Sequence, residues 1–114
     1  MTRPIEFRAW DEPSQSMIED AQPKKAIYYN QPLMQFTGLL DCNGKKIFEG
    51  DIMSLGENNN YFVEYKVDRF WLSKWVGETI HPDGNDGYYR ICLPAYCTSS
   101  GIIGNIYQNK ELLK

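Results

Sequence analysis

Glu49 and Asp51 are the first residues in this chain that could do chemistry, because two carboxylates two positions apart share one face of a strand. A pair of neighbouring carboxyl groups can divide the roles of general acid and general base. Nothing beside them in the sequence supplies a base or a metal partner, and carboxylates that flank a glycine at a strand corner usually accept hydrogen bonds from backbone N–H groups. We therefore expect a structural role for the pair, and we predict no catalytic residues and no enzyme activity.

The sequence has a single histidine, His81, and three cysteines, Cys42, Cys92 and Cys97. Cys92, Cys97 and His81 could supply three zinc ligands, but Pro94 interrupts the spacing and no second pair of ligands accompanies it. Neither a Ser-His-Asp triad nor a glycine-rich phosphate-binding loop can be assembled from these residue types and spacings. We predict no metal, no cofactor, and cysteines that stay as free thiols in a reducing compartment.

Aromatic residues make up 14% of the chain, and five large ones bracket the glycine-rich segment 77–87: Phe70, Trp71, Trp75, Tyr88 and Tyr89. Large aromatics beside a loop are a common means by which small barrels recognise peptides. The alternative is that they fill the core. We predict a partner-binding surface made of Trp71, Trp75, Tyr88 and Tyr89. In a more detailed form of this prediction, Trp71 and Phe62 point inward, while Trp75 and one of the two tyrosines face solvent.

The elements that must position these side chains are most clearly marked between Leu33 and Asp51. Asn43-Gly44 predicts a tight type I′ turn with two positive-φ residues, across which Leu39-Leu40 and Ile47-Phe48 pair as strand ends. Gly50 lies between two carboxylates, just before an apolar run. A bulge or barrel corner favours a residue without a Cβ at such a point, so we expect the chain to turn there.

Alternating apolar and polar residues predict further strands. These are Ile5–Trp10, Met17-Ile18, Ile52–Leu55, Tyr61–Val67, Phe70–Leu72, Tyr88–Leu93 and Ile102–Tyr107. We interpret Glu19 to Lys25 as a surface loop and expect a last helical turn after Asn109. The pattern indicates a mainly β fold: a small SH3-like barrel or roll of short antiparallel strands, with an N-terminal β arm and at most a short terminal helix.

A chain of 114 residues is large enough for one hydrophobic core. We expect a single domain over 1–114, with an N-terminal arm and loop at 1–32 and a β-barrel part at 33–114. The arm should dock onto its own chain rather than onto a neighbour's edge. The abundance of aromatic and apolar residues nevertheless predicts a dimer or trimer at high concentration.

The net charge is −3, and no run of basic residues exceeds Lys24-Lys25 or Lys45-Lys46. This composition lacks the electrostatic footprint of a protein that binds a phosphate backbone. Charged residues interrupt the first ten positions, and no apolar stretch approaches the length of a membrane span. We expect a cytoplasmic protein with no membrane partner.

Three sequence blocks together resemble the YopX family of bacteriophage and prophage proteins. They are IEFRAWD (Ile5–Asp11), LMQFTGLLDCNGKKIFEGDI (Leu33–Ile52) and IGNIYQNKELL (Ile103–Leu113). The resemblance implies a mostly β architecture with an SH3-like barrel in the C-terminal part, a phage or prophage origin, and expression in the cytoplasm of a bacterial host. It implies no activity and assigns no catalytic or binding residue.

Two functional interpretations follow. In the first, the chain is a non-enzymatic accessory protein that binds a host or phage protein and can form a homo-oligomer. In the second, it is a nucleic-acid-associated barrel of the SH3 or OB type, whose candidate contacts are Arg3, Arg8, Lys24 and Lys25. The negative net charge favours the first.

Overall fold

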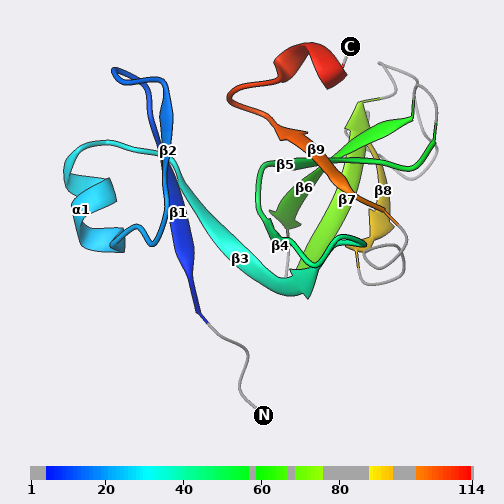
Figure 1. The fold of residues 1–114 in the computed structure, drawn as a ribbon, viewed down its shortest axis with the longest axis horizontal. Helices are drawn as coiled ribbons and strands as arrows, with labels where there is room; N and C mark the ends of the chain where they lie inside the picture. The colour runs from blue at the N-terminus through cyan, green and yellow to red at the C-terminus, as the bar shows by residue number, and fades with distance from the viewer. Residues whose placement is uncertain (1–4, 57–58, 67–68, 76–87, 94–99, 114) are drawn as a thin grey trace.

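The computed structural model describes residues 5–56, 59–66, 69–75, 88–93 and 100–113. The strands are β1 (Phe7–Asp11), β2 (Ser16–Ile18), β3 (Leu33–Leu40), β4 (Lys46–Phe48), β5 (Asp51–Ser54), β6 (Asn60–Lys66), β7 (Arg69–Trp75), β8 (Tyr88–Cys92) and β9 (Ile102–Asn105). They form two antiparallel sheets, in the orders β2-β1-β3-β4 and β8-β7-β6-β5-β9, and the second sheet is curled (Figure 1). The predicted mainly β fold of short antiparallel strands is confirmed.

The helical elements are short. Within the described residues they include the helix α1 (Pro23–Tyr28) and the 3-10 helix η2 (Lys110–Leu113). None of the helices within the described residues is long and apolar enough to cross a membrane.

The N-terminal arm folds back onto its own chain, as expected. β1 pairs with β2 on one side and with β3 on the other, where Arg8 lies opposite Met34. Beyond β2, the Ala21 N–H donates to the Phe7 carbonyl at 2.9 Å. Ala9 and Trp10 are almost completely buried. The arm is therefore an integral part of the first sheet.

The turn between β3 and β4 differs from the predicted type I′ hairpin. The Asp41 N–H donates to the Lys45 carbonyl, so the loop contains three residues, and only Gly44 has a positive φ (+79°). The Asp41 carboxylate accepts hydrogen bonds from the N–H groups of Asn43 and Lys45, which holds Asn43 out of the left-handed region. A three-residue loop with a left-handed glycine at its end is another standard hairpin connection. The pairing of β3 with β4 therefore differs by one residue from that expected for a two-residue turn, because Leu40 pairs with Lys46.

Gly50 forms the predicted corner, with a φ of +86°. It carries the chain from β4 in the first sheet to β5 in the second. Its N–H donates to the Val63 carbonyl and its carbonyl accepts from the Ile106 N–H, both at 2.8 Å. A Cβ at this position would lie 3.1 Å from the Met34 sulfur. The corner thus has both the backbone conformation and the close approach that favour glycine.

The main hydrophobic core packs on one face of the second sheet. Its buried members are Ile47, Met53, Tyr61, Val63, Phe70, Leu72 and Leu93. The alternation predicted for β6 is confirmed, because Tyr61 and Val63 are buried while Phe62 and Glu64 lie on the opposite face and are half-buried. Ile47 comes from β4, so the first sheet also contributes to this core.

The helix α1 occupies a segment that sequence patterning suggested was partly a loop. Pro23 begins it, Ala26 is its one buried residue, and Asn30 follows with a left-handed φ of +55°. Proline at the start and asparagine just after the end are ordinary helix boundary signals. Six residues are too few for the 3.6-residue apolar period to be visible in the sequence. The predicted terminal turn appears as η2, although the side chain of Asn109 accepts from the Asn105 N–H instead of capping it.

Candidate functional site

Three of the four predicted partner-binding residues share one face of the second sheet. In the β7–β8 pairing, Trp75 lies opposite Tyr88 and Trp71 lies opposite Cys92. Because side chains alternate along a strand, Trp71, Trp75 and Tyr88 lie on the face opposite the core. Tyr89 lies on the other face, where its ring is 6.4 Å from that of Tyr61. The prediction of one surface for all four is therefore not matched by the fold.

These aromatic rings contact one another. The Tyr88 ring lies 5.0 Å from that of Trp75 and 5.9 Å from that of Phe62, in edge-on geometry. Trp75 is 51% exposed and Trp71, Tyr88 and Phe62 are half-buried. The expectation that Trp71 and Phe62 point into the core is wrong. Trp71 pairs with Glu64 and Phe62 pairs with Ser73, so both lie on the face of the sheet away from the core residues Val63 and Leu72. Trp75 faces solvent as predicted.

A charged pair lies among these rings. Arg90 Nε donates to Glu64 Oε1 at 2.6 Å, and the hydroxyl of Ser73 donates to the same oxygen at 2.8 Å. The Arg90 guanidinium is 5.3 Å from the centre of the Tyr88 ring. We call this surface the aromatic face and define it by Phe62, Glu64, Trp71, Trp75, Tyr88 and Arg90. Sequence reasoning missed the charged pair, because only the strand register shows that its two members meet.

The aromatic face belongs to β6, β7 and β8, at the end of the molecule away from α1 (Figure 1). Aromatic residues and arginine are enriched in the central parts of protein–protein interfaces. The carboxylate of Glu64 is already neutralised by Arg90. A partner that covers this face therefore does not bury an unpaired charge at Glu64. The arrangement is suited to binding a protein surface.

Glu49 and Asp51 lie at the junction between the two sheets. Glu49 Oε1 accepts from the Gln35 N–H at 2.9 Å, and Asp51 Oδ2 accepts from the Phe48 N–H at 2.8 Å. The expected role as acceptors for backbone N–H groups is confirmed. Asp51 is also paired with Arg8, whose Nη2 donates to Asp51 Oδ1 at 2.6 Å. Both oxygens of Asp51 are thus engaged in holding β1, β4 and β5 together.

Arg8 is the residue of this junction that sequence reasoning missed. A charged residue at an alternating position in a terminal arm predicts exposure, yet Arg8 is only 7% exposed. Its guanidinium packs 4.8 Å from the centre of the Phe48 ring. Of the four candidate contacts to nucleic acid, Arg8 is thus largely buried and paired with Asp51, and Arg3 lies outside the described residues. Lys24 and Lys25 are exposed on α1.

Burial shapes the electrostatics of the junction. It raises the pKa of Asp51, which the Arg8 charge and the Phe48 N–H oppose. It also raises the pKa of Glu49, against the opposing Gln35 N–H. The pKa of Tyr107 is raised by burial and by the Glu49 carboxylate, with Arg8 opposing. Tyr107 stacks on Trp10 with ring centres 5.7 Å apart. This aromatic contact adds to the Arg8–Asp51 pair in holding the junction together.

Among the described residues, no group of three histidine, cysteine or acidic side chains is arranged to hold a metal ion. Cys42 is exposed and Cys92 is half-buried, and both are free thiols. His81 and Cys97, the other candidate ligands, lie outside the described residues. The prediction that the protein holds no zinc stays a prediction.

Comparison with known proteins identifies the family. The sequence matches the family described as YopX protein over residues 20–114. No curated protein matches the chain. Among solved structures, the chain is similar to the crystal structure of protein EF1440 from Enterococcus faecalis, with 22% identity and a TM-score of 0.67, over 99% of this chain and 100% of that one. At this identity the similarity shows a shared fold.

Proposed function

Because this chain belongs to the YopX protein family, we propose that it is a non-enzymatic accessory protein encoded by a bacteriophage or prophage. It acts in the cytoplasm of a bacterial host by binding a host or phage protein. The aromatic face is the binding surface. The phage origin is implied by the family resemblance, and the SH3-like barrel in the C-terminal part is implied both by the strand pattern and by that resemblance.

The observation that carries this proposal is the composition of the aromatic face. Trp75 is a half-exposed tryptophan whose ring packs edge-on against Tyr88, so it is already held in place before a partner arrives. A preorganised aromatic side chain loses little conformational entropy on binding. The neighbouring Glu64–Arg90 pair supplies polar contacts with fixed geometry. Trp75 is therefore the expected centre of the interface.

The charge distribution favours a protein partner over a nucleic acid. The chain carries a net charge of −3. Arg8, one of its few candidate phosphate contacts, is buried against Asp51. On the aromatic face, Arg90 is paired with Glu64. Salt-dependent binding to a phosphate backbone requires several free cations on one surface, which these pairings do not provide.

Site-specific photocrosslinking tests the proposal. A photoreactive phenylalanine analogue replaces Trp75 in the full chain, expressed in host cells during phage growth or prophage induction. The matched control places the same analogue at Tyr28, an 82% exposed tyrosine on α1. We expect a discrete protein adduct from position 75 that position 28 does not give.

The digestion pattern of the adduct separates the two functional classes. If nuclease removes the adduct at position 75, and protease digestion leaves a peptide linked to nucleotides, the partner is a nucleic acid. That result would contradict the proposed protein partner. Identical adducts from both positions, or none from position 75, would contradict the assignment of the aromatic face.

A further inference from the structure

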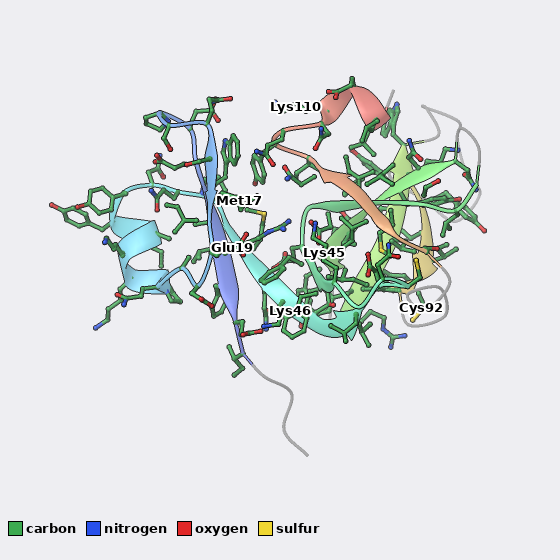
Figure 2. All side chains as sticks on the ribbon, viewed as in Figure 1. Met17, Glu19, Lys45, Lys46, Cys92 and Lys110 are labelled. Atoms are coloured by element: carbon green, nitrogen blue, oxygen red, sulfur yellow. The ribbon has the colours of Figure 1, made fainter. Side chains whose placement is uncertain are left out.

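A second candidate site lies on the first sheet, apart from the aromatic face. It is a cleft of about 380 Å³ whose charged lining comes from β1, β4 and the segments beside them. Three of its side chains are basic and three are acidic: Arg8, Lys45 and Lys46, and Glu6, Glu19 and Asp20. Figure 2 shows Glu19 beside β1, with Lys45 and Lys46 across from it. Phe48 completes the wall.

Two of the residues that line this cleft, Arg8 and Glu6, each carry a buried polar atom, and the two atoms are of opposite character. Among the described residues, Arg8 Nε and Glu6 Oε2 are the buried side-chain atoms without a hydrogen-bond partner. The side chain of Arg8 is 8% exposed, and its Nη2 donates to Asp51 Oδ1 and to the Glu49 carbonyl. The other oxygen of Glu6 accepts from Lys46 Nζ at 2.9 Å. Each group is thus anchored through one atom, and a second atom of each has no hydrogen-bond partner.

The two groups are arranged for a ligand that has opposite charges at its two ends. Glu6 and Arg8 are two residues apart, and Glu6 continues the strand because its carbonyl accepts from the Phe36 N–H. Side chains at this spacing lie on one face, with Cα atoms separated by about 7 Å. A donor on a guanidinium and an acceptor on a carboxylate call for a ligand with an anionic acceptor near an ammonium donor.

The balance of charges in the lining supports the same ligand class. With three basic and three acidic side chains, a net anion or a net cation meets like charges as well as opposite ones. A zwitterion can place each of its charges against the opposite sign. The cleft volume falls in the range of small-molecule sites.

We propose that this cleft binds a small zwitterion of the α-amino-acid type. The ligand carboxylate accepts a hydrogen bond from Arg8 Nε, and the ligand ammonium donates one to Glu6 Oε2. Phe48 supplies the apolar wall beside them. The site is independent of the aromatic face, so either assignment can fail without the other.

Nuclear magnetic resonance tests the proposal on the full chain labelled with nitrogen-15, because the Nε–H group of Arg8 gives its own signal. Three probes with a common skeleton are titrated: glycine, which is a zwitterion, glycinamide, which is a cation, and N-acetylglycine, which is an anion. We expect glycine to shift the Arg8 signal saturably, with a Kd at least about tenfold below that of either singly charged probe.

Two variants refine the test. Glu6→Gln keeps an oxygen acceptor but removes the negative charge, and should weaken glycine binding about tenfold. Lys24→Gln changes an exposed lysine on α1 that does not line the cleft, and should leave binding unchanged. No saturable shift of the Arg8 signal, or equal shifts by all three probes on the unaltered chain, would overturn the proposal and leave a water-filled cleft.

Discussion

Gly50 and Gly44 allow the cost of a left-handed backbone to be separated from the cost of crowding. Both have a positive φ, but a Cβ at Gly44 meets nothing within 4 Å, whereas one at Gly50 meets Met34 at 3.1 Å. Gly44→Ala should therefore cost about 1–2 kcal/mol of unfolding free energy, from backbone conformation alone. Gly50→Ala should cost at least about 1 kcal/mol more, since overpacking is added. Urea denaturation measures both, and equal losses would remove the close approach from the explanation of the corner.

The Arg8–Asp51 pair predicts a large effect from a small change. Asp51→Asn removes the charge that neutralises a buried guanidinium, and should destabilise the protein by about 3–5 kcal/mol. Lys46→Gln breaks the more exposed Lys46–Glu6 pair and should cost less than about 1 kcal/mol. Chemical denaturation of the two variants is the measurement. A loss for Asp51→Asn as small as that for Lys46→Gln would show that the junction contributes little to stability.

Glu49 gives the junction a characteristic pH dependence. Burial raises its folded-state pKa above the ordinary value of 4.5, so the unfolded chain releases this proton first as the pH rises. The contribution of Glu49 to stability therefore falls from about pH 4.5 upward, until the folded carboxyl has also ionised. Glu49→Gln should lack this decline. Thermal melts of both proteins between pH 4 and pH 7 test it, and parallel curves would contradict a raised pKa.

The loop between β3 and β4 should show the opposite pH dependence. Burial alone would raise the pKa of Asp41, but N–H donors from Ile102, Lys45 and Asn43, together with the Lys45 charge, lower it. Its ionised form therefore stabilises the fold above about pH 3.8, and the stabilisation is lost as the pH falls through the lowered folded-state pKa. Asp41→Asn should be less stable than the unaltered protein at neutral pH. The difference should shrink in acid, and a constant difference would exclude the ionised carboxylate as its source.

Side-chain contacts of Asp41 and of the asparagines near β9 hold the C-terminal segment in place. Asp41 Oδ2 accepts from the Ile102 N–H, which joins the loop between β3 and β4 to β9. In the C-terminal block, the side chain of Asn109 folds over Gly104, where a Cβ would lie 2.5 Å from Asn109 Oδ1. Asn105 Oδ1 accepts from the N–H groups of Tyr107 and Gln108. These local contacts give a physical reason for the residues of the IGNIYQN stretch.

The strands and the corner could be predicted from the sequence, because period-two alternation and a glycine between polar residues are local signals. The three-residue loop could not, since its conformation depends on the Asp41 carboxylate. Nor could the burial of Arg8, because it depends on a partner 43 residues away. The aromatic face was predicted only in part, since strand register decides that Tyr89 faces away from Trp71 and Trp75. Pairings between distant segments thus limited the prediction of the site.

In the whole molecule, the three blocks that resemble the YopX family meet at one place. Arg8 comes from the first block, Gly50 and Asp51 from the second, and Tyr107 from the third. Together they join the two sheets beside the Gly50 corner. The blocks therefore account for the junction between the two sheets, and the aromatic face lies outside all three. Self-association at high concentration stays a prediction, which light scattering can test.

The central claim is that the aromatic face binds a protein partner, and the affinity of Trp75→Ala for the partner crosslinked at that position tests it most directly. Tyr28→Ala, which removes a more exposed aromatic ring on α1, is the matched control. We predict a Kd at least about tenfold weaker for Trp75→Ala, as expected for an interface hot spot, with the affinity of Tyr28→Ala unchanged and both variants still unfolding cooperatively above the assay temperature. Equal affinity of Trp75→Ala and the unaltered protein would contradict the account.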